Sequence, residues 1–135
     1  MNKGVQTLMG MLFAGAATGC SPVGGAINEV GMDGFIDAYK KNPQVKVLDV
    51  RTPGEFAQGR VPGAKLLSLQ ELSSLGSAAS EKIPFEKDDE IYVICRSGSR
   101  SRSAVQILNS LGYTNAINVG GGTMTWSHYG NPLER

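Results

Sequence analysis

The chain has 135 residues, 41% of them hydrophobic, which is enough for one domain with its own core. Thirteen basic and 12 acidic residues are interspersed and leave a formal net charge of +1, which argues against a nucleic-acid-binding surface. With two cysteines and one histidine, His128, the chain falls short of the ligands of a zinc site, so we expect no metal and no other cofactor.

Residues 1–19 have the pattern of a signal peptide. Lys3 gives a positive start, and a short apolar run over residues 7–17 leads through small residues to Cys20. The run is too short for a good spanning helix, which needs about 20 residues, so we expect export to the periplasm or cell envelope. The segment also resembles a bacterial lipobox, with Ala17 where leucine is usual, which makes Cys20 a candidate for lipidation and the only expected membrane attachment. Cleavage by an ordinary signal peptidase nearby and retention as an uncleaved anchor are the alternatives.

A flexible, glycine-containing spacer is expected over residues 20–29, followed by a single domain over residues 30–135. An oxidising compartment would permit a disulfide between Cys20 and Cys95. Lipidation of Cys20 would exclude that bond, and a flexible spacer offers no fixed geometry for it. We therefore expect Cys95 to be free.

The first half of the domain contains a helix and a strand with clear boundaries. Apolar residues at helical spacing predict a short helix between Asp33, a candidate cap, and a stop at residues 42–43. A β-branched run over residues 45–50 predicts a strand, and residues 51–54 predict a turn after it. A second strand, a helical turn or two, and a linker of small residues are then expected over residues 64–67, 70–75 and 76–80.

The second half repeats the order of strand and helix. Residues 91–95 form a nearly continuous apolar run, which is typical of a strand covered on both faces in a parallel sheet. A helix is expected from Ser101 to a stop at Gly112, then a strand over residues 116–119 and a short helix that carries Trp126. This alternation predicts an α/β fold, in which sites lie at the carboxyl ends of the strands.

Cys95 is the strongest catalytic candidate because it ends an apolar strand and opens a cationic turn. The turn consists of Arg96, Ser97, Gly98, Ser99 and Arg100. Backbone N–H groups of such a turn can converge on one point, and the positive end of the following helix adds to their field, so the thiol should ionise readily. A buried core cysteine is the alternative, but it would gain nothing from arginine neighbours.

Three motifs together resemble the rhodanese family. Residues 49–64 are similar to its first signature, with Arg60 in place of the usual histidine. Residues 95–100 are similar to its six-residue active loop, and residues 121–122 with Trp126 to its closing signature. The resemblance covers nearly all of the chain after the spacer. It implies a mainly parallel sheet of about five strands with helices on both faces.

The resemblance also implies a sulfurtransferase. Cys95 would take sulfane sulfur from a small anionic donor, thiosulfate or polysulfide, as a persulfide and pass it to a thiol, cyanide or a thioredoxin-like protein. The N–H groups of the loop would cradle the sulfur as an oxyanion hole cradles oxygen. Arg96 would meet the anionic end of the donor. For Arg100, contact with substrate and bracing of the loop by bonds to backbone carbonyls are both open.

Three residues of the first signature are expected to support the loop. Asp49 would hydrogen-bond near the site, and Arg51 and Glu55, four residues apart, would form an ion pair that fixes the turn. We expect Trp126 to anchor the last helix in the core, and we assign no role to His128.

The Cys95 loop is also compatible with functions other than an enzymatic sulfurtransferase. A sulfur carrier would use the same Cys95 persulfide and would differ only in its dependence on a partner. Cysteine phosphatases of the dual-specificity type share the architecture, but their loop is one residue longer and has an arginine where this chain has Ser101. The shorter loop suits one sulfur atom better than a phosphate. An inactive interaction module would have no need of a perturbed thiol.

Overall fold

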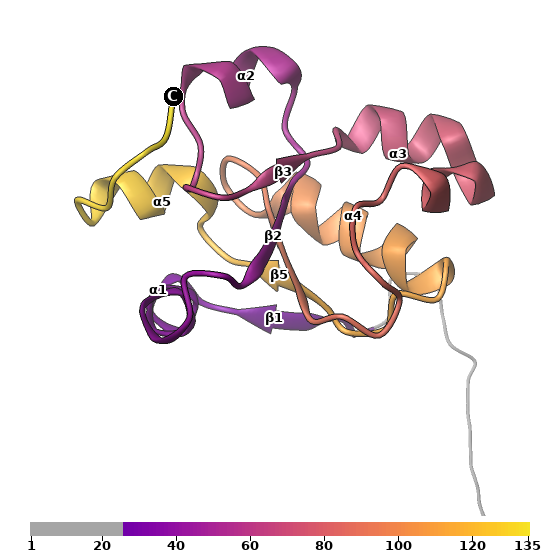
Figure 1. Cartoon of the computed structure of the whole chain (residues 1–135), viewed down its shortest axis with the longest axis horizontal. Coiled ribbons are helices and arrows are strands. Elements are labelled where there is room, and N and C mark those ends of the chain that lie inside the picture. Colours follow the sequence, from indigo (N-terminus) through magenta and orange to yellow (C-terminus); the bar gives the residue numbers. More distant parts are fainter. Residues whose placement is uncertain (1–25) are drawn as a thin grey trace, which may run out of the picture.

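The computed structural model describes residues 26–135, which fold around a five-stranded sheet (Figure 1). Its strands are β1 (Asn28–Val30), β2 (Lys46–Asp49), β3 (Lys65–Leu66), β4 (Ile91–Ile94) and β5 (Ala116–Val119). Every neighbouring pair is parallel, and the order across the sheet is β1-β5-β4-β2-β3. The central strand is therefore β4, whose carboxyl end leads directly into Cys95.

Helices cover both faces of the sheet, as the resemblance implied. One core contains Phe35 of α1 (Met32–Lys41) and Trp126 of α5 (Gly122–His128), whose ring centroids lie 5.6 Å apart. The other contains Leu72 of α3 (Leu69–Leu75) and Leu108 of α4 (Ser99–Ser110). Trp126 is buried, as predicted, and its indole N–H donates to the Pro132 carbonyl oxygen at 2.8 Å.

The predicted turn after β2 is a helix, α2 (Pro53–Gln58), which lies beyond the carboxyl end of that strand (Figure 1). Thr52 and Glu55 form a capping box at its start. Thr52 Oγ1 accepts from the Glu55 N–H at 3.2 Å, and Glu55 Oε1 accepts from the Thr52 N–H at 3.0 Å. These two bonds satisfy backbone donors that a first helical turn leaves without partners, so the proline and glycine of this segment begin a helix.

Three smaller predictions also need correction. Asn28 and Glu29, placed in the spacer, pair with β5 as part of β1, so the sheet begins before residue 30. The predicted linker over residues 76–80 is a 3-10 helix, η2 (Gly76–Glu81), and its Ala79 is buried in the core. Asp33 lies in the first turn of α1, and Gly31 occupies the cap position.

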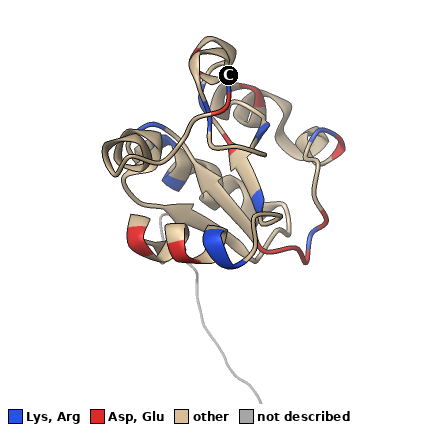
Figure 2. Ribbon diagram, turned by 60° about the vertical axis from the view of Figure 1, so that its left-hand side comes forward, with Lys and Arg blue, Asp and Glu red and all other residues tan. Residues whose placement is uncertain are grey.

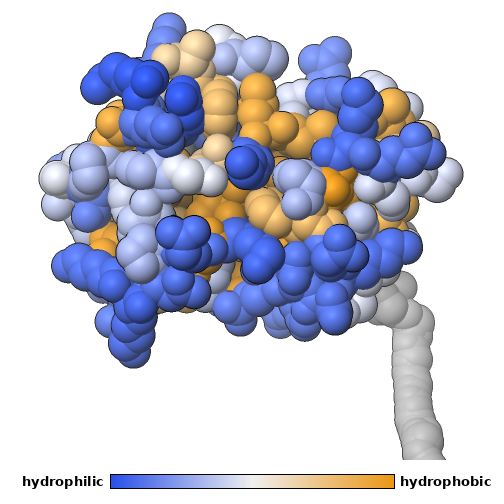
Figure 3. Space-filling view, viewed as in Figure 1, coloured by the Kyte–Doolittle hydropathy of each residue, from blue (hydrophilic) through white to orange (hydrophobic). Residues whose placement is uncertain are grey.

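The surface of the described chain is polar and of mixed charge. Figure 2 shows acidic and basic residues distributed along the ribbon, and Figure 3 shows hydrophilic residues around the rim of one face with apolar surface toward its middle. Within residues 26–135, no helix has the length and apolarity to cross a membrane. The predicted signal peptide over residues 1–19 and Cys20 lie outside the described residues.

Candidate active site

Cys95 lies at the carboxyl end of β4 with only 1% of its surface exposed, and its thiol is free. The chain turns sharply after it at Gly98, whose φ of +110° is in the left-handed region that favours glycine. Helix α4 begins at the next residue, Ser99. The turn therefore brings the positive end of a 12-residue helix to the sulfur.

Several donors surround the sulfur. The Gly98 N–H donates to Cys95 Sγ at 3.1 Å, and Ser101 Oγ lies 3.4 Å from the same atom. Burial raises the pKa of the thiol, but the hydrogen bond with the Ser101 hydroxyl and those from the N–H groups of Ser101, Gly98 and Ser97 outweigh it. The net pKa of Cys95 is therefore lowered. The site thus favours a thiolate, and His128, which is exposed, takes no part in these contacts.

Ser101 and Asn118 are the two residues near the sulfur to which sequence analysis gave no role. The hydroxyl of Ser101, in the first turn of α4, donates to Asn118 Oδ1 at 2.5 Å, and both side chains are buried. Asn118 comes from β5, the strand next to β4. A polar residue inside a short, otherwise apolar strand was the available signal, because buried polar groups need partners.

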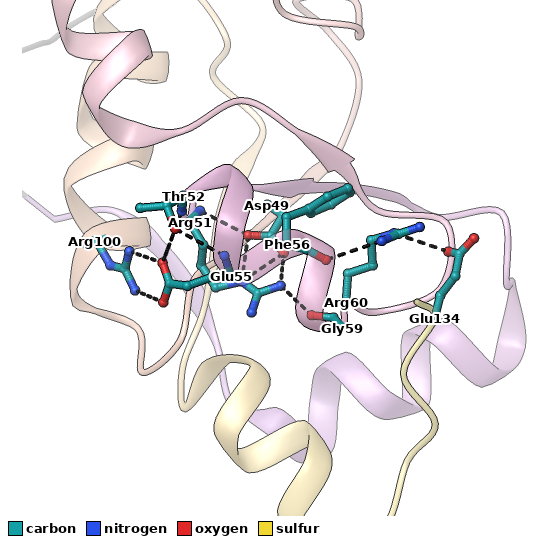
Figure 4. Close-up of polar contacts among 9 residues, drawn as sticks. All are labelled: Asp49, Arg51, Thr52, Glu55, Phe56, Gly59, Arg60, Arg100 and Glu134. Atoms are coloured by element: carbon teal, nitrogen blue, oxygen red, sulfur yellow. Dashed lines mark hydrogen bonds and ion pairs between the residues drawn. The ribbon is translucent and has the colours of Figure 1, made fainter.

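Arg100 braces the loop through a carboxylate. Figure 4 shows its guanidinium facing Glu55 of α2; Arg100 Nη1 donates to Oε1 at 2.8 Å and Nη2 to Oε2 at 2.9 Å. The hydrogen bond from Arg100 is the main reason that the pKa of Glu55 falls to about 2. Of the two roles open for Arg100, the geometry supports bracing, but Glu55 takes the place of the expected backbone carbonyls.

The predicted ion pair between Arg51 and Glu55 is wrong. Arg51 pairs with Asp49, with Nη2 2.7 Å from Oδ2, and the same Nη2 donates to the Gly59 carbonyl oxygen at 2.8 Å (Figure 4). Asp49 is fully buried, and a buried carboxylate needs a charged partner within reach. Asp49 therefore holds Arg51 and the end of α2, and it makes no hydrogen bond to the Cys95 loop.

The start of α5 supports the loop from another side. The Thr123 N–H donates to the Cys95 carbonyl oxygen at 2.8 Å, and the Met124 N–H donates to the Arg96 carbonyl oxygen at 3.1 Å. Gly122 has a φ of +61°, and a Cβ there would lie 2.3 Å from the Arg96 carbonyl oxygen. Glycine is required at this position because two backbone segments meet without room for a side chain.

A cavity of about 410 Å³ adjoins the loop. Its wall includes the exposed Arg96, the buried Arg51, and Thr123 and Met124 of α5. Glu55 also reaches this wall, but its charge is matched by Arg100. The size is that of a small-molecule site, and the guanidinium of Arg96, which has no acidic partner among residues 26–135, favours an anion.

Replacing Glu55 with glutamine should reduce stability by less than about 1 kcal/mol at pH 7, because the Glu55–Arg100 pair is about one-third exposed. The lowered pKa of Glu55 means that this stabilisation is weaker in acid. The contribution of the Glu55 carboxylate to the free energy of unfolding is complete above the ordinary pKa of 4.5 and is lost as the pH falls toward 2. Urea unfolding of wild type and Glu55→Gln should therefore show a difference in the free energy of unfolding that becomes smaller as the pH falls through this range.

Glu71→Gln is the matched control, since Glu71 occupies the same position in the cap of α3. A difference between wild type and Glu55→Gln that grows on acidification would contradict the bracing role of Glu55.

Comparison with known proteins gives a consistent result. Residues 35–129 match the model of the rhodanese-like domain. A sulfurtransferase of Allochromatium vinosum is 33% identical over 107 residues, covering 79% of this chain and 94% of the relative. The human thiosulfate:glutathione sulfurtransferase is 33% identical over 91 residues, covering 62% of this chain and 79% of the relative. The crystal structure of a rhodanese-related protein of Thermoplasma volcanium superimposes with a TM-score of 0.64 at 32% identity, covering 79% of this chain and 97% of that one. The chain belongs to the rhodanese family.

Proposed function

We propose that this protein is a sulfurtransferase that carries sulfane sulfur on Cys95. The observation that carries the proposal is a buried thiol held toward its ionised form by the donors of residues 97–101, while the next residue, Arg96, lines a cavity and has no ion-pair partner among residues 26–135. A thiolate is the nucleophile in sulfur chemistry, and preorganised donors at the sulfur replace a partner base. The names of the two curated relatives support this class of reaction.

The reaction has two balanced steps. In the first, Cys95 Sγ attacks the outer sulfur of thiosulfate; the new S–S bond forms as the old one breaks, and its electron pair leaves with sulfite. In the second, the thiolate of an acceptor, or cyanide, attacks the outer sulfur of the persulfide, and Cys95 leaves as a thiolate. No outside oxidant or reductant is needed.

The cationic cavity supports an anionic donor. Arg96 follows the nucleophile, is exposed, and lines the cavity, so it can bind the sulfonate end of thiosulfate or the charged end of a polysulfide. Arg100 is less suited to that task, because both of the nitrogens that face Glu55 already donate to it. The same pairing weighs against a phosphatase, which needs a free arginine at the end of its loop to hold phosphate.

The direct test is the mass of Cys95 after exposure to sulfur donors. Purified protein is incubated with thiosulfate or polysulfide without reductant and analysed intact and as peptides; an added sulfur of about 32 Da on the Cys95 peptide is expected. Turnover with thiosulfate and cyanide is compared with transfer from the loaded protein to a protein dithiol, which separates an enzyme from a carrier. An unmodified Cys95 with every donor would overturn the proposal.

Replacing Arg96 with alanine should weaken the use of thiosulfate about tenfold, the equivalent of one charge-assisted contact of about 1.4 kcal/mol. The effect should appear in KM for thiosulfate and leave transfer from a preloaded persulfide to cyanide nearly unchanged. Arg96→Lys keeps the charge and should recover part of the loss. Unchanged thiosulfate kinetics in Arg96→Ala would remove Arg96 from the donor site.

We also propose that the protein is exported and tethered to the cell envelope by a lipid on Cys20. The support is the sequence of residues 1–20, in which a positive start and a short apolar run lead to Cys20. The mass of the N-terminal peptide of the mature protein tests it. A diacylated Cys20 is expected, and a peptide that still begins at Met1 would contradict processing.

A further inference from the structure

A chain of three buried polar groups leads from the sulfur into the core. Cys95 Sγ lies 3.4 Å from Ser101 Oγ, which lies 2.5 Å from Asn118 Oδ1. The three residues are exposed by 1%, 0% and 1%, and they come from the end of β4, the first turn of α4 and β5. Within the described part of the chain, the Ser101 hydroxyl is therefore the link between the sulfur and the amide.

A hydroxyl has one proton and can donate it to only one neighbour at a time. In the structure the Ser101 hydroxyl donates to Asn118 Oδ1, so its oxygen can only accept from the Cys95 S–H, and this arrangement stabilises the neutral thiol. If the amide of Asn118 is turned over, its NH₂ group donates to Ser101 Oγ, and the Ser101 proton points at Sγ. This second arrangement stabilises the thiolate. The oxygen and nitrogen of an amide have nearly the same size, so both arrangements fit the same space.

We propose that Asn118 is a positioning residue that, by turning its amide, directs the Ser101 proton toward Cys95 Sγ whenever the sulfur is ionised. The arrangement matters twice in the proposed reaction, because Sγ is a thiolate when it attacks the donor and again when it leaves the persulfide. The role of Asn118 in catalysis rests on the proposed function. Its effect on the ionisation of the free Cys95 thiol does not, because that effect can be measured without a sulfur donor.

Charged groups near the sulfur are few among the described residues, so the effect of Asn118 can be isolated. Arg100 of α4 interacts electrostatically with Cys95 and is itself held by Glu55 of α2. Asp49, at the end of β2, acts on Arg100 and is paired with Arg51. From β5 the group that faces Ser101 is the neutral Asn118. Changes at Asn118 leave these ion pairs in place.

The test is the pH dependence of Cys95 alkylation by iodoacetamide in the full-length protein, followed on the Cys95 peptide so that Cys20 does not contribute. Asn118→Asp has the same shape but, when ionised, only accepts hydrogen bonds. The carboxyl is a stronger acid than the thiol, so it ionises first and holds the Ser101 proton. We expect the midpoint of the alkylation profile to rise by at least about one pH unit and the rate at pH 7 to fall about tenfold or more.

Two further variants separate positioning from a structural role. Asn118→Leu removes the NH₂ group that would hold Ser101 Oγ in the second arrangement and leaves the hydroxyl free to donate to a backbone carbonyl, so alkylation should slow about threefold, less than in Asn118→Asp. Ser101→Ala removes the donor and should slow alkylation several-fold, and Asn118→Asp should have a smaller effect in that background. Asn115→Asp, the same change at an exposed position before β5, is the control and should match wild type.

Three results would overturn the proposal. The first is an alkylation profile of Asn118→Asp with the wild-type midpoint. The second is an equal loss of alkylation rate in Asn118→Leu and Asn118→Asp. The third is a loss of rate from Asn118→Asp that is as large in the Ser101→Ala background as in wild type. Circular dichroism checks that each variant is folded. Should Asn118→Asp fail to fold, Asn118→Leu decides the outcome: a slower alkylation that depends on the presence of Ser101 supports the proposal, and a wild-type rate overturns it.

Discussion

Replacing Cys95 with serine should abolish sulfur loading and turnover while leaving the fold intact. A serine hydroxyl is almost the same size as the thiol and can accept the bond from the Gly98 N–H, so we expect the free energy of unfolding to change by about 1 kcal/mol or less. The hydroxyl does not ionise near neutral pH and forms no persulfide, so sulfur loading should fall below detection.

The measurement is peptide mass after incubation with thiosulfate, beside urea unfolding of the same preparations. Cys20→Ser is the matched control, because it makes the same chemical change at the other cysteine and should load Cys95 fully. Labile sulfur on Cys95→Ser at the wild-type level would place the sulfur on another residue and contradict the proposed function.

Replacing Gly122 with alanine should damage both stability and sulfur transfer. The new Cβ would lie 2.3 Å from the Arg96 carbonyl oxygen and 2.4 Å from the Cys95 carbonyl oxygen, at a φ of +61°. Neither contact can be relieved by a rotating side chain, because both atoms belong to the backbone. We expect a loss of about 2–4 kcal/mol in the free energy of unfolding, from overpacking added to a strained φ.

Movement of the loop should also slow the chemistry. The clash pushes on the backbone of Cys95 and Arg96, so the donors that converge on Sγ lose their alignment, and sulfur loading should slow by about 100-fold. Gly76→Ala is the matched control, since Gly76 has a φ of +56° with open space around its Cβ position. The Gly76→Ala variant should lose about 1 kcal/mol in the free energy of unfolding and should load sulfur at the wild-type rate. Equal loading rates for the two variants would show that Gly122 does not support the loop.

Much of the architecture is predictable from local patterns. The apolar run of β4 requires cover on both faces of a sheet, and the helical spacing after Ser101 requires one buried helix face. These patterns place Cys95 at a strand end before a helix. The helix α2 is not predicted, although its capping box of Thr52 and Glu55 is visible in the sequence, because Pro53 and Gly54 are typical of a turn.

The partners of the charged and polar side chains were less predictable. Arg51 and Glu55 are four residues apart, yet each is bonded elsewhere, Arg51 to the buried Asp49 and Glu55 to Arg100, which is 45 residues away in the chain. Helical spacing brings two side chains within reach, but burial decides which charges must be matched. Since burial is a property of the assembled fold, the pairing could not be derived from spacing alone.

The sequence by itself determined the α/β architecture, the position of Cys95 at the carboxyl end of a buried strand, and the glycine-containing cationic loop, because periodicity and turn chemistry act over a few residues. The tertiary structure alone decided that Glu55 braces Arg100, that Gly122 presses on the loop backbone, and that Asn118 reaches the sulfur through Ser101. Each of these contacts joins residues distant in sequence. Their distances are set by how the strands align and how the helices pack on them.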